Sequence, residues 1–353
     1  MDKRVVFAVA GSGKTTRIIA CLDLERRFLL VTYTDNNLAT LRRKVFEKFG
    51  FIPANITLLT YFSFLHAFCY RPLLAMRMRT KGISFDMPPE HTRWLSRALD
   101  AFYIDPSRRL YHNRIAKLLD TKGVIAEAAK RVEKYFDVLC FDEVQDIGGH
   151  DFQLLEAICG CDMDLLLVGD FFQHTYTSSQ DGNVNGGLHA DYTKYKRRLQ
   201  MAGLTVDTTS LAKSHRCSAT VSQFIREYMG IDIHSHTDRA TDVVHITKQN
   251  EFDELHACEK TVKLFIQEHA RYGCHSQNWG GSKGQDHHRD VCVVLHQAAY
   301  KAYLAGGLRE ISPLTMSKLY VACSRASGNL YLVSDKLAEK FKQPAAAKRA
   351  TSL

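Results

Sequence analysis

The stretch "AVAGSGKT" at residues 8–15 decides the fold class of this chain. An apolar segment, "RVVFAV" at residues 4–9, leads into it, and helical spacing follows from residue 14 to about residue 24. A glycine-rich turn between a strand and a helix points backbone N–H groups at a bound phosphate. The pattern is that of a P-loop in which Ala8 replaces the first glycine. An incidental glycine turn is the alternative, and the flanking strand and helix disfavour it.

A P-loop assigns a role to each of its residues. The lysine reaches the β- and γ-phosphates, and the hydroxyl after it binds Mg²⁺. We therefore predict ATP and Mg²⁺ as ligands, with Thr15 on the metal. The predicted nucleotide-binding residues of this loop are Gly11, Ser12, Gly13, Lys14, Thr15 and Thr16.

A second stretch, "VLCFDEVQD" at residues 138–146, ends an apolar strand on a group of acidic side chains. These carboxylates could be an ordinary solvated strand end. In a P-loop NTPase, however, an acidic residue at this position holds the metal. We predict that Asp142 binds Mg²⁺ and that Glu143 orients or deprotonates the attacking water.

Strands and helices alternate along most of the chain, which favours parallel α/β architecture. The predicted strands are 4–9, 27–33, 56–61, 137–141 and 164–170, and later 243–247, 291–295 and 330–334. Helices are predicted at 36–48 and about 151–159. Two α/β domains follow, at 1–205 and 206–340. The first carries a small, basic, mostly helical insertion at about 65–135. We expect a loop at 178–187 and a disordered tail at 341–353.

The composition favours a polyanionic partner. The formal net charge is +9 and the pI is about 9.0. Basic residues cluster at 41–45, 77–81, 108–109 and 194–198. Each cluster alone is more often a solvated face than a binding site. Together they favour nucleic acid.

The same composition predicts a cytoplasmic, intracellular protein that does not act in a membrane. No apolar stretch approaches the roughly 18 residues of a membrane-spanning helix, and the N-terminus does not resemble a signal peptide. None of the ten cysteines forms a C-x-x-C pair, so we expect reduced thiols. The histidines at 275, 287 and 288 lie near Cys274 and Cys292, but their spacing does not favour a metal cluster.

Six further motifs follow in a fixed order. They are "TYTDNNLATLRRKV" (32–45), "TYFSF" (60–64), "VGDFFQHTY" (168–176), "LAKSHRCS" (211–218), "GGSKGQDHHRDVCVVL" (280–295) and "KLYVACSRAS" (318–327). With the P-loop and "FDEVQD", this series resembles the superfamily 1 helicases of the UvrD/Rep/PcrA type. The resemblance spans residues 5–333, and it depends on the order of the motifs and not on any single one.

The resemblance implies two RecA-like P-loop NTPase domains and roles for the remaining residues. Gln173 and Arg216 would sense the γ-phosphate, and Arg325 would be a second arginine finger. His215 stands where a tyrosine stacks on adenine, Gly284 lies at the phosphate edge, and Asp286 lies near the position of a ribose-contacting glutamate. The implied nucleic-acid contacts are Tyr33, Thr60, Phe62 and Tyr176.

The sequence also departs from that family. There is no upstream glutamine motif, Phe62 replaces a histidine, and the arginine-containing segment after "VGDFFQHTY" is missing. The large insertion of the second domain is absent too. The pattern is that of a minimal member of a phage or bacterial type.

The function that the sequence predicts is an ATP-dependent DNA helicase or translocase that hydrolyses ATP between two RecA-like domains. It would move on single-stranded or partially duplex DNA, 3′→5′ as its relatives do, with RNA not excluded and a replication, recombination or repair protein as a possible partner. The alternative is a nucleotide-switched ATPase that binds DNA or a protein without processive unwinding. A small-molecule phosphotransferase is disfavoured, because it would not explain the later motifs.

Overall fold

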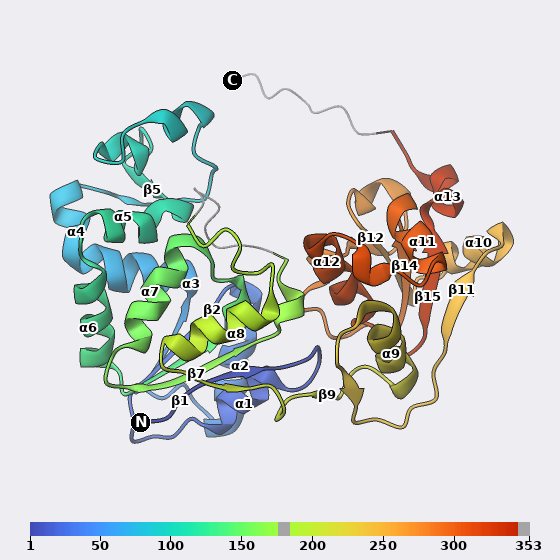
Figure 1. Ribbon diagram of the computed structural model, residues 1–353, viewed down its shortest axis with the longest axis horizontal. Coiled ribbons are helices and arrows are strands. Elements are labelled where there is room, and N and C mark those ends of the chain that lie inside the picture. The colour runs from blue at the N-terminus through green and yellow to red at the C-terminus, as the bar shows by residue number, and fades with distance from the viewer. Residues whose placement is uncertain (176–183, 345–353) are drawn as a thin grey trace. The chain divides into compact units, whose positions relative to one another are not determined.

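The structure is a computed structural model that describes residues 1–175 and 184–344 (Figure 1). By its contacts the chain divides into two units. The first unit comprises Met1–Ala8 and Lys14–Ser210, and the second comprises Val9–Gly13 and Leu211–Leu353. Three predicted features lie outside the described residues: the nucleic-acid contact Tyr176, residues 178–183 of the predicted loop, and the predicted tail from residue 345 onward.

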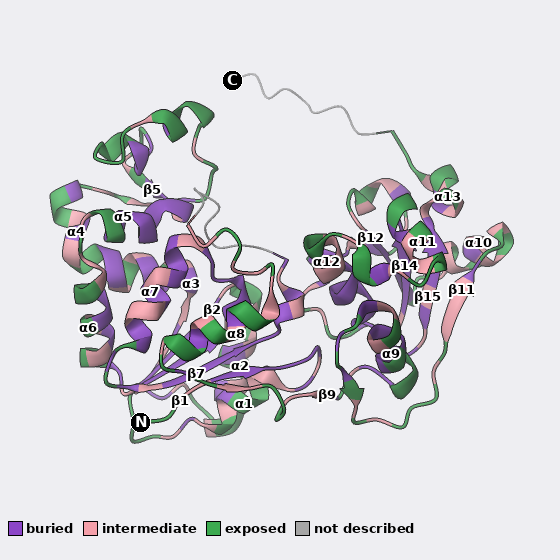
Figure 2. Cartoon of the chain, in the orientation of Figure 1, coloured by how far each residue is buried: buried purple, intermediate pink, exposed green. Residues whose placement is uncertain are grey.

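The first unit is built on a six-stranded parallel sheet with the order β3-β2-β6-β7-β1-β8. The strands are β1 (Lys3–Phe7), β2 (Phe28–Thr32), β3 (Ile56–Thr60), β6 (Val138–Asp142), β7 (Asp164–Gly169) and β8 (Thr205–Asp207). Strands β2 and β6 are buried along their whole length (Figure 2). Continuous apolar runs such as "FLLVT" are the expected sequence of strands covered on both faces.

Helices cover both faces of this sheet (Figure 1). Helices α1 (Lys14–Ala20) and α2 (Asp35–Phe49) lie on one face, and α1 contacts β6 and β7. Helices α7 (Gly149–Cys159) and α8 (Tyr192–Met201) contribute Phe152 and Tyr195 to the main apolar core, together with Val5 and Phe7 of β1. Short turns follow the strands: α3 (Tyr61–Ser63), η5 (Val144–Asp146) and η6 (Phe171–Gln173).

The predicted helical insertion is helical only at its two ends. These ends contain the π-helix η1 (Phe64–Tyr70) and helices α4 (Arg71–Met78), α5 (Ile115–Thr121) and α6 (Ile125–Tyr135). Its centre holds a parallel strand pair, β4 (Gly82–Ser84) and β5 (Arg109–Tyr111), with the 3₁₀ turns η2 (Glu90–Trp94), η3 (Asp100–Phe102) and η4 (His112–Arg114). Pro88 and Pro89 explain the difference, because proline disfavours helical backbone before it and lacks an N–H donor.

The second unit has a five-stranded parallel sheet with the order β11-β15-β14-β12-β13. Its strands are β11 (Val243–Ile246), β12 (Thr261–Phe265), β13 (Ser276–Asn278), β14 (Asp290–Leu295) and β15 (Leu330–Ser334). Its α-helices are α9 (Ala219–Phe224), α10 (Gln249–Ala257), α11 (Gln297–Leu304), α12 (Pro313–Cys323) and α13 (Asp335–Ala338). The prediction of two parallel α/β domains is confirmed.

Shorter elements complete the second unit. They are the strand pair β9 (Lys213–Ser214) and β10 (His234–Ser235), the π-helix η7 (Ile225–Met229), and the 3₁₀ turns η8 (His269–Tyr272), η9 (Gly280–Ser282), η10 (Leu308–Glu310) and η11 (Glu339–Phe341). Across the described part of the chain, no helix is both long enough and apolar enough to cross a bilayer.

Candidate functional site

The carboxyl ends of the strands in the first unit gather the acidic residues that the sequence singles out. Asp142 ends β6 and pairs in register with Val168 of β7, and Asp170 follows β7 directly. On the other side of β7, Phe7 of β1 pairs with Gly169, and the Ala8 N–H donates to the Gly169 carbonyl at 2.8 Å. Ligands of open parallel sheets bind outside this edge. The start of the P-loop and both carboxylates therefore share the expected ligand-binding edge.

The P-loop adopts a backbone that requires glycine. Gly11 has a φ of +69° and Gly13 a φ of +93°, values that residues with a Cβ rarely adopt. A Cβ on Gly11 would also lie 2.7 Å from Cβ of Arg216, and both residues belong to the second unit. Ser12 is buried, and its hydroxyl donates to the Val9 carbonyl at 2.8 Å.

Lys14 and Thr15 begin helix α1 in the first unit, and both are half-buried. The exposed Thr16 hydroxyl accepts a hydrogen bond from Nζ of Lys44 at 3.2 Å. Asp142 is buried, with 4% of its surface exposed. One hydroxyl and one carboxylate are a suitable protein donor set for Mg²⁺, which otherwise keeps water and phosphate oxygens.

Glu143 is held in a specific geometry beside Asp142. Its φ of +62° is left-handed, and such backbone strain in a non-glycine residue is concentrated at functional sites. Its N–H donates to Oδ1 of Asp142 at 3.1 Å, and its Oε2 accepts from Nε2 of Gln145 at 2.5 Å. The carboxylate is therefore fixed by its own backbone and by a neighbouring amide.

Gln145 is a site residue to which the sequence analysis assigned no role. Its side chain is fully buried, and its Oε1 accepts the N–H of Asp170 at 3.0 Å while its Nε2 binds Glu143. A Cβ on Gly169 would lie 2.4 Å from that Oε1, so a glycine is needed at the end of β7. The available signal was an amide two positions after the candidate base.

The segment after β7 continues the same network. Gln173 is buried, and its N–H donates to the Asp170 carbonyl at 2.9 Å. Nδ1 of His174 lies 2.7 Å from the Gln145 carbonyl, and its ring stacks on His189 with centroids 3.7 Å apart. Burial, and then the neighbouring His174, lower the pKa of His189 to about 3.

The described residues with predicted nucleic-acid contacts lie together at the ends of β2 and β3. Tyr33 follows Thr32, which pairs in register with Thr60. The Tyr33 and Phe62 rings have centroids 5.7 Å apart. The Thr60 hydroxyl caps α3 by accepting the Ser63 N–H at 3.3 Å. The aromatic cluster is half-buried at the edge of the sheet.

In the second unit, both predicted arginines converge on one carboxylate. Oδ1 of Asp286 accepts from Nη2 of Arg216 and lies 3.2 Å from Nη1 of Arg325. Backbone carbonyls of Ser324 and Gln285 accept further bonds from the two guanidinium groups, at 3.1 and 3.3 Å. The sequence predicted a γ-phosphate role for each arginine, and the structure brings the two together.

His215 and Gly284 are the last two residues for which the sequence predicted nucleotide contacts. Their interactions differ from those of the Arg216, Arg325 and Asp286 cluster. The exposed His215 stacks its ring on His236, with centroids 4.1 Å apart and planes 8° apart. Gly284 is exposed with a φ of +82°, in the segment that leads to Asp286.

Comparison with known proteins identifies the family. A family model described as an AAA domain matches residues 2–179. The chain belongs to the AAA domain family. No match is found among curated proteins.

Solved structures similar to this AAA domain protein include three helicase structures. The structure of arterivirus nonstructural protein 10 (helicase) in complex with DNA has a TM-score of 0.50 at 14% identity. The match covers 96% of this chain and 62% of the helicase chain. A crystal structure of arterivirus nonstructural protein 10 (helicase) has a TM-score of 0.47 at 15% identity, and the match covers 96% of this chain and 62% of that one. The PRRSV helicase scores 0.46 at 13% identity, covering 97% and 55%.

These similarities establish the fold of the AAA domain protein as two RecA-like domains with parallel sheets. The chain spans 55–62% of the length of these three solved structures. The assignment to superfamily 1 helicases of the UvrD/Rep/PcrA type stays a prediction.

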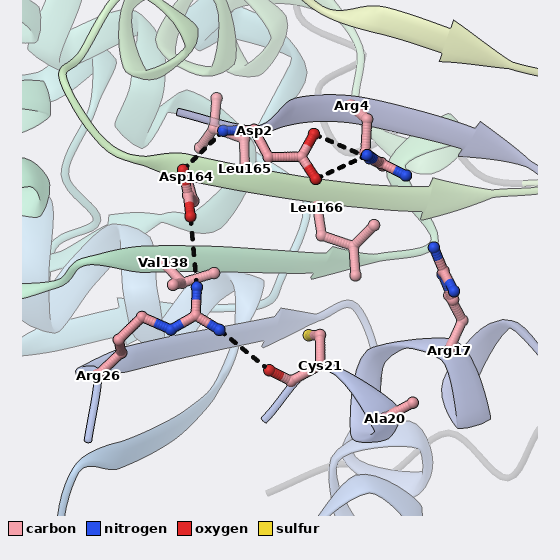
Figure 3. A pocket seen from close by; sticks show the side chains of 10 residues that line it. All are labelled: Asp2, Arg4, Arg17, Ala20, Cys21, Arg26, Val138, Asp164, Leu165 and Leu166. Atoms are coloured by element: carbon pink, nitrogen blue, oxygen red, sulfur yellow. Dashed lines mark hydrogen bonds and ion pairs between the residues drawn. The ribbon is translucent and has the colours of Figure 1, made fainter. Parts of the chain in front are cut away.

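A pocket of about 260 Å³ lies elsewhere in the first unit of the AAA domain protein (Figure 3). It is lined by Arg4 of β1, Val138 of β6, Leu165 of β7 and Cys21 after α1. These positions are at the amino ends of the strands and at the far end of α1 from Lys14. The pocket is therefore not the P-loop site. Arg26 reaches Asp164 there at 3.3 Å.

Proposed function

We propose that this AAA domain protein is an ATP-dependent helicase or translocase that acts on single-stranded DNA. The observation that carries the proposal is the hydrogen-bonded network of Asp142, Glu143, Gln145 and the Asp170 backbone, at the sheet edge where the P-loop begins. A phosphate-binding loop could serve many enzymes. A rigidly held carboxylate beside a metal-binding aspartate is what hydrolysis requires.

The proposed chemistry is attack of water on the γ-phosphate of ATP. Lys14 binds the β- and γ-phosphates, and Thr15 and Asp142 hold Mg²⁺. Glu143 orients the water and accepts its proton as the bond from the γ-phosphorus to the bridging oxygen breaks, which leaves ADP and phosphate. Gln173 senses the γ-phosphate.

Arg216 and Arg325 supply positive charge to the transition state from the second unit. If these arginines reach the phosphate in only one arrangement of the two units, hydrolysis would be coupled to the motion of the units. Tyr33, Thr60, Phe62 and Tyr176 would contact the strand, with the aromatic rings as stacking platforms. Movement in the 3′→5′ direction belongs to this proposal, as do His215, Gly284 and Thr16 as nucleotide contacts.

The test is steady-state ATP hydrolysis with and without single-stranded DNA or RNA, followed by displacement of a duplex strand from 3′- and 5′-tailed substrates. We expect stimulation by DNA and unwinding from a 3′ tail. Hydrolysis that DNA stimulates without strand displacement would favour the nucleotide-switched ATPase. Hydrolysis that no nucleic acid affects would contradict the helicase.

Two variants test the site itself. Lys14→Ala should abolish hydrolysis and weaken ATP binding, whereas Glu143→Gln should abolish hydrolysis and leave ATP binding largely intact. The reason is that Lys14 binds the phosphates of the ground state, whereas Glu143 acts on the water. Wild-type turnover in either variant would refute the assignment.

A further inference from the structure

Arg216 and Arg325 of the second unit share one acceptor, the carboxylate of Asp286. Arg325 is 2% exposed and the Arg216 side chain 11% exposed, whereas the Asp286 side chain is 66% exposed. Both guanidinium groups contact the same oxygen, Oδ1 of Asp286. A mostly exposed carboxylate therefore partners two mostly buried cations.

Electrostatics explain why an anion is needed at this point. Two guanidinium groups that converge in a partly buried place repel each other, and an anion between them relieves the repulsion. Backbone carbonyls also accept from both guanidinium groups, but they carry no net charge. Asp286 therefore supplies negative charge to both arginines at once.

The pKa of the neighbouring His288 is lowered by burial and in part by the positive charge of the two arginines. His288 is buried, and burial lowers its pKa to about 4, with the flanking histidines and then Arg325 and Arg216 acting in the same direction. The site thus disfavours an additional cation although Asp286 is present. An anion is favoured at this position.

The placement of Asp286 makes it replaceable. It lies in the segment between η9 and β14, two residues after Gly284, whose φ of +82° lies in the region open to glycine. Arginine binds carboxylate and phosphate oxygens in similar geometry. A terminal phosphate can therefore take the position of the Asp286 carboxylate without a new arrangement of donors.

We propose that Asp286 is a carboxylate stand-in for the terminal phosphate of the nucleotide, which holds Arg216 and Arg325 until that phosphate displaces it. This inference rests on the proposed function and deepens it. It differs from the ribose contact that the sequence resemblance implied for Asp286. A ribose contact strengthens nucleotide binding, whereas a stand-in competes with it.

The test measures binding of a fluorescent, non-hydrolysable ATP analogue to the full chain, so that it does not depend on turnover. If the wild type holds both arginines on Asp286 about 90% of the time, then Asp286→Asn should lower the Kd about tenfold. Asp286→Glu, which keeps the carboxylate, should restore a Kd near the wild-type value. The corresponding ADP analogue should show a smaller change, because it lacks the terminal phosphate.

Asp232→Asn is the matched control. Asp232 is in the same unit, its side chain is 85% exposed and pairs with His234, and its substitution changes the net charge equally. A similar gain in both variants would assign the effect to overall charge and overturn the proposal. Unchanged or weaker binding in Asp286→Asn would also overturn it, and weaker binding would restore the ribose contact. If the wild type itself bound no ATP analogue, that result would contradict the proposed ATP-dependent function and not only the role of Asp286.

Discussion

At the scale of single residues, the buried amide of Gln145 holds the carboxylate that we propose as the catalytic base. It holds Glu143 at 2.5 Å and the Asp170 N–H at 3.0 Å. Gln145→Ala removes the donor that orients the Glu143 carboxylate and leaves the P-loop unchanged. We expect kcat for ATP hydrolysis to fall roughly 10–100-fold, because small misplacements of catalytic groups have effects of this size. The Kd for ATP should change little.

Gln200→Ala is the control for that substitution, because Gln200 is an exposed glutamine on α8. It should hydrolyse ATP at the wild-type rate. If Gln145→Ala lost ATP affinity and kcat to the same degree, Gln145 would be supporting the whole site and not orienting Glu143. Circular dichroism of both variants checks that the fold is kept.

The stacked pair His174 and His189 makes a prediction about pH. Burial, and then His174, lower the pKa of His189 from its ordinary value of 6.5 to about 3. Between these values the unfolded chain binds a proton at this residue and the folded chain does not. The free energy of unfolding should therefore fall as the pH drops below about 6.5, by at most about 1.4 kcal/mol per pH unit for this one group.

Thermal unfolding between pH 7 and pH 4 measures this slope. His189→Gln should unfold with a shallower dependence on pH than the wild type, because it lacks the group that titrates on unfolding. His91→Gln, which changes an exposed histidine, should keep the wild-type slope. Equal slopes in all three proteins would show that His189 does not contribute.

Residue-level prediction from the sequence is strongest where chemistry restricts the choice of side chain. A P-loop lysine and the acidic pair after an apolar strand have few other reasons to occur in that order. Gln145 and the contacts of Asp286 could not be predicted in this way. Their partners, Asp170 and the two arginines, are distant in sequence, and only the fold brings them together.

At the scale of elements, the ends of β2 and β3 form an aromatic cluster that continues into the insertion. Phe62 contacts Tyr33 at a centroid distance of 5.7 Å, and it also contacts Phe85 at 5.6 Å and His112 at 5.2 Å. Phe85 is 65% exposed. Rings at the carboxyl edge of a sheet, partly open to solvent, are suited to stacking on bases.

Tyr33→Ala tests this cluster. It should weaken binding of single-stranded DNA by about 1–3 kcal/mol, the usual contribution of one stacked base, and reduce stimulation of ATP hydrolysis. Basal hydrolysis should remain, because Tyr33 is outside the network around Glu143. Phe46→Ala is the matched control, since Phe46 is a 56% exposed aromatic residue on α2. Fluorescence anisotropy of labelled DNA measures both, and equal affinities would argue against stacking by Tyr33.

Most strands were predictable from their apolar runs, but a charged residue inside a run and a polar helix surface each hid one element. Strand β12 was missed because Lys263 lies at the centre of "TVKLF". In the structure Lys263 is buried, and its Nζ donates to the Cys258 and Thr261 carbonyls at 2.9 and 3.0 Å. Helix α8 was missed because its sequence, "YTKYKRRLQM", is polar, although Tyr195 and Leu199 are buried in the core.

At the scale of the whole molecule, the motifs of the first unit predicted a parallel α/β domain because they lie at the carboxyl ends of its strands β1, β2, β3, β6 and β7. The sequence could not define how the 65–135 insertion folds, since its central strands β4 and β5 have only three residues each. Much of this insertion belongs to the same apolar core as the main sheet, through Leu65, Tyr70 and Leu118 among others. It is part of the first unit's core and not a separate module.

The net charge of +9 makes a prediction for the whole chain. All four basic clusters fall within the first unit, so binding of single-stranded DNA should release counterions and weaken as salt rises. If about four phosphates are contacted, a fourfold rise in salt should lower the affinity roughly 50-fold. Titrations of one labelled oligonucleotide at several salt concentrations give the slope of affinity against salt.

An oligonucleotide with an uncharged backbone is the control, because it has no counterions to release and should show almost no slope. Equal slopes for the two would mean that salt acts on the protein and that the basic clusters do not contact phosphates.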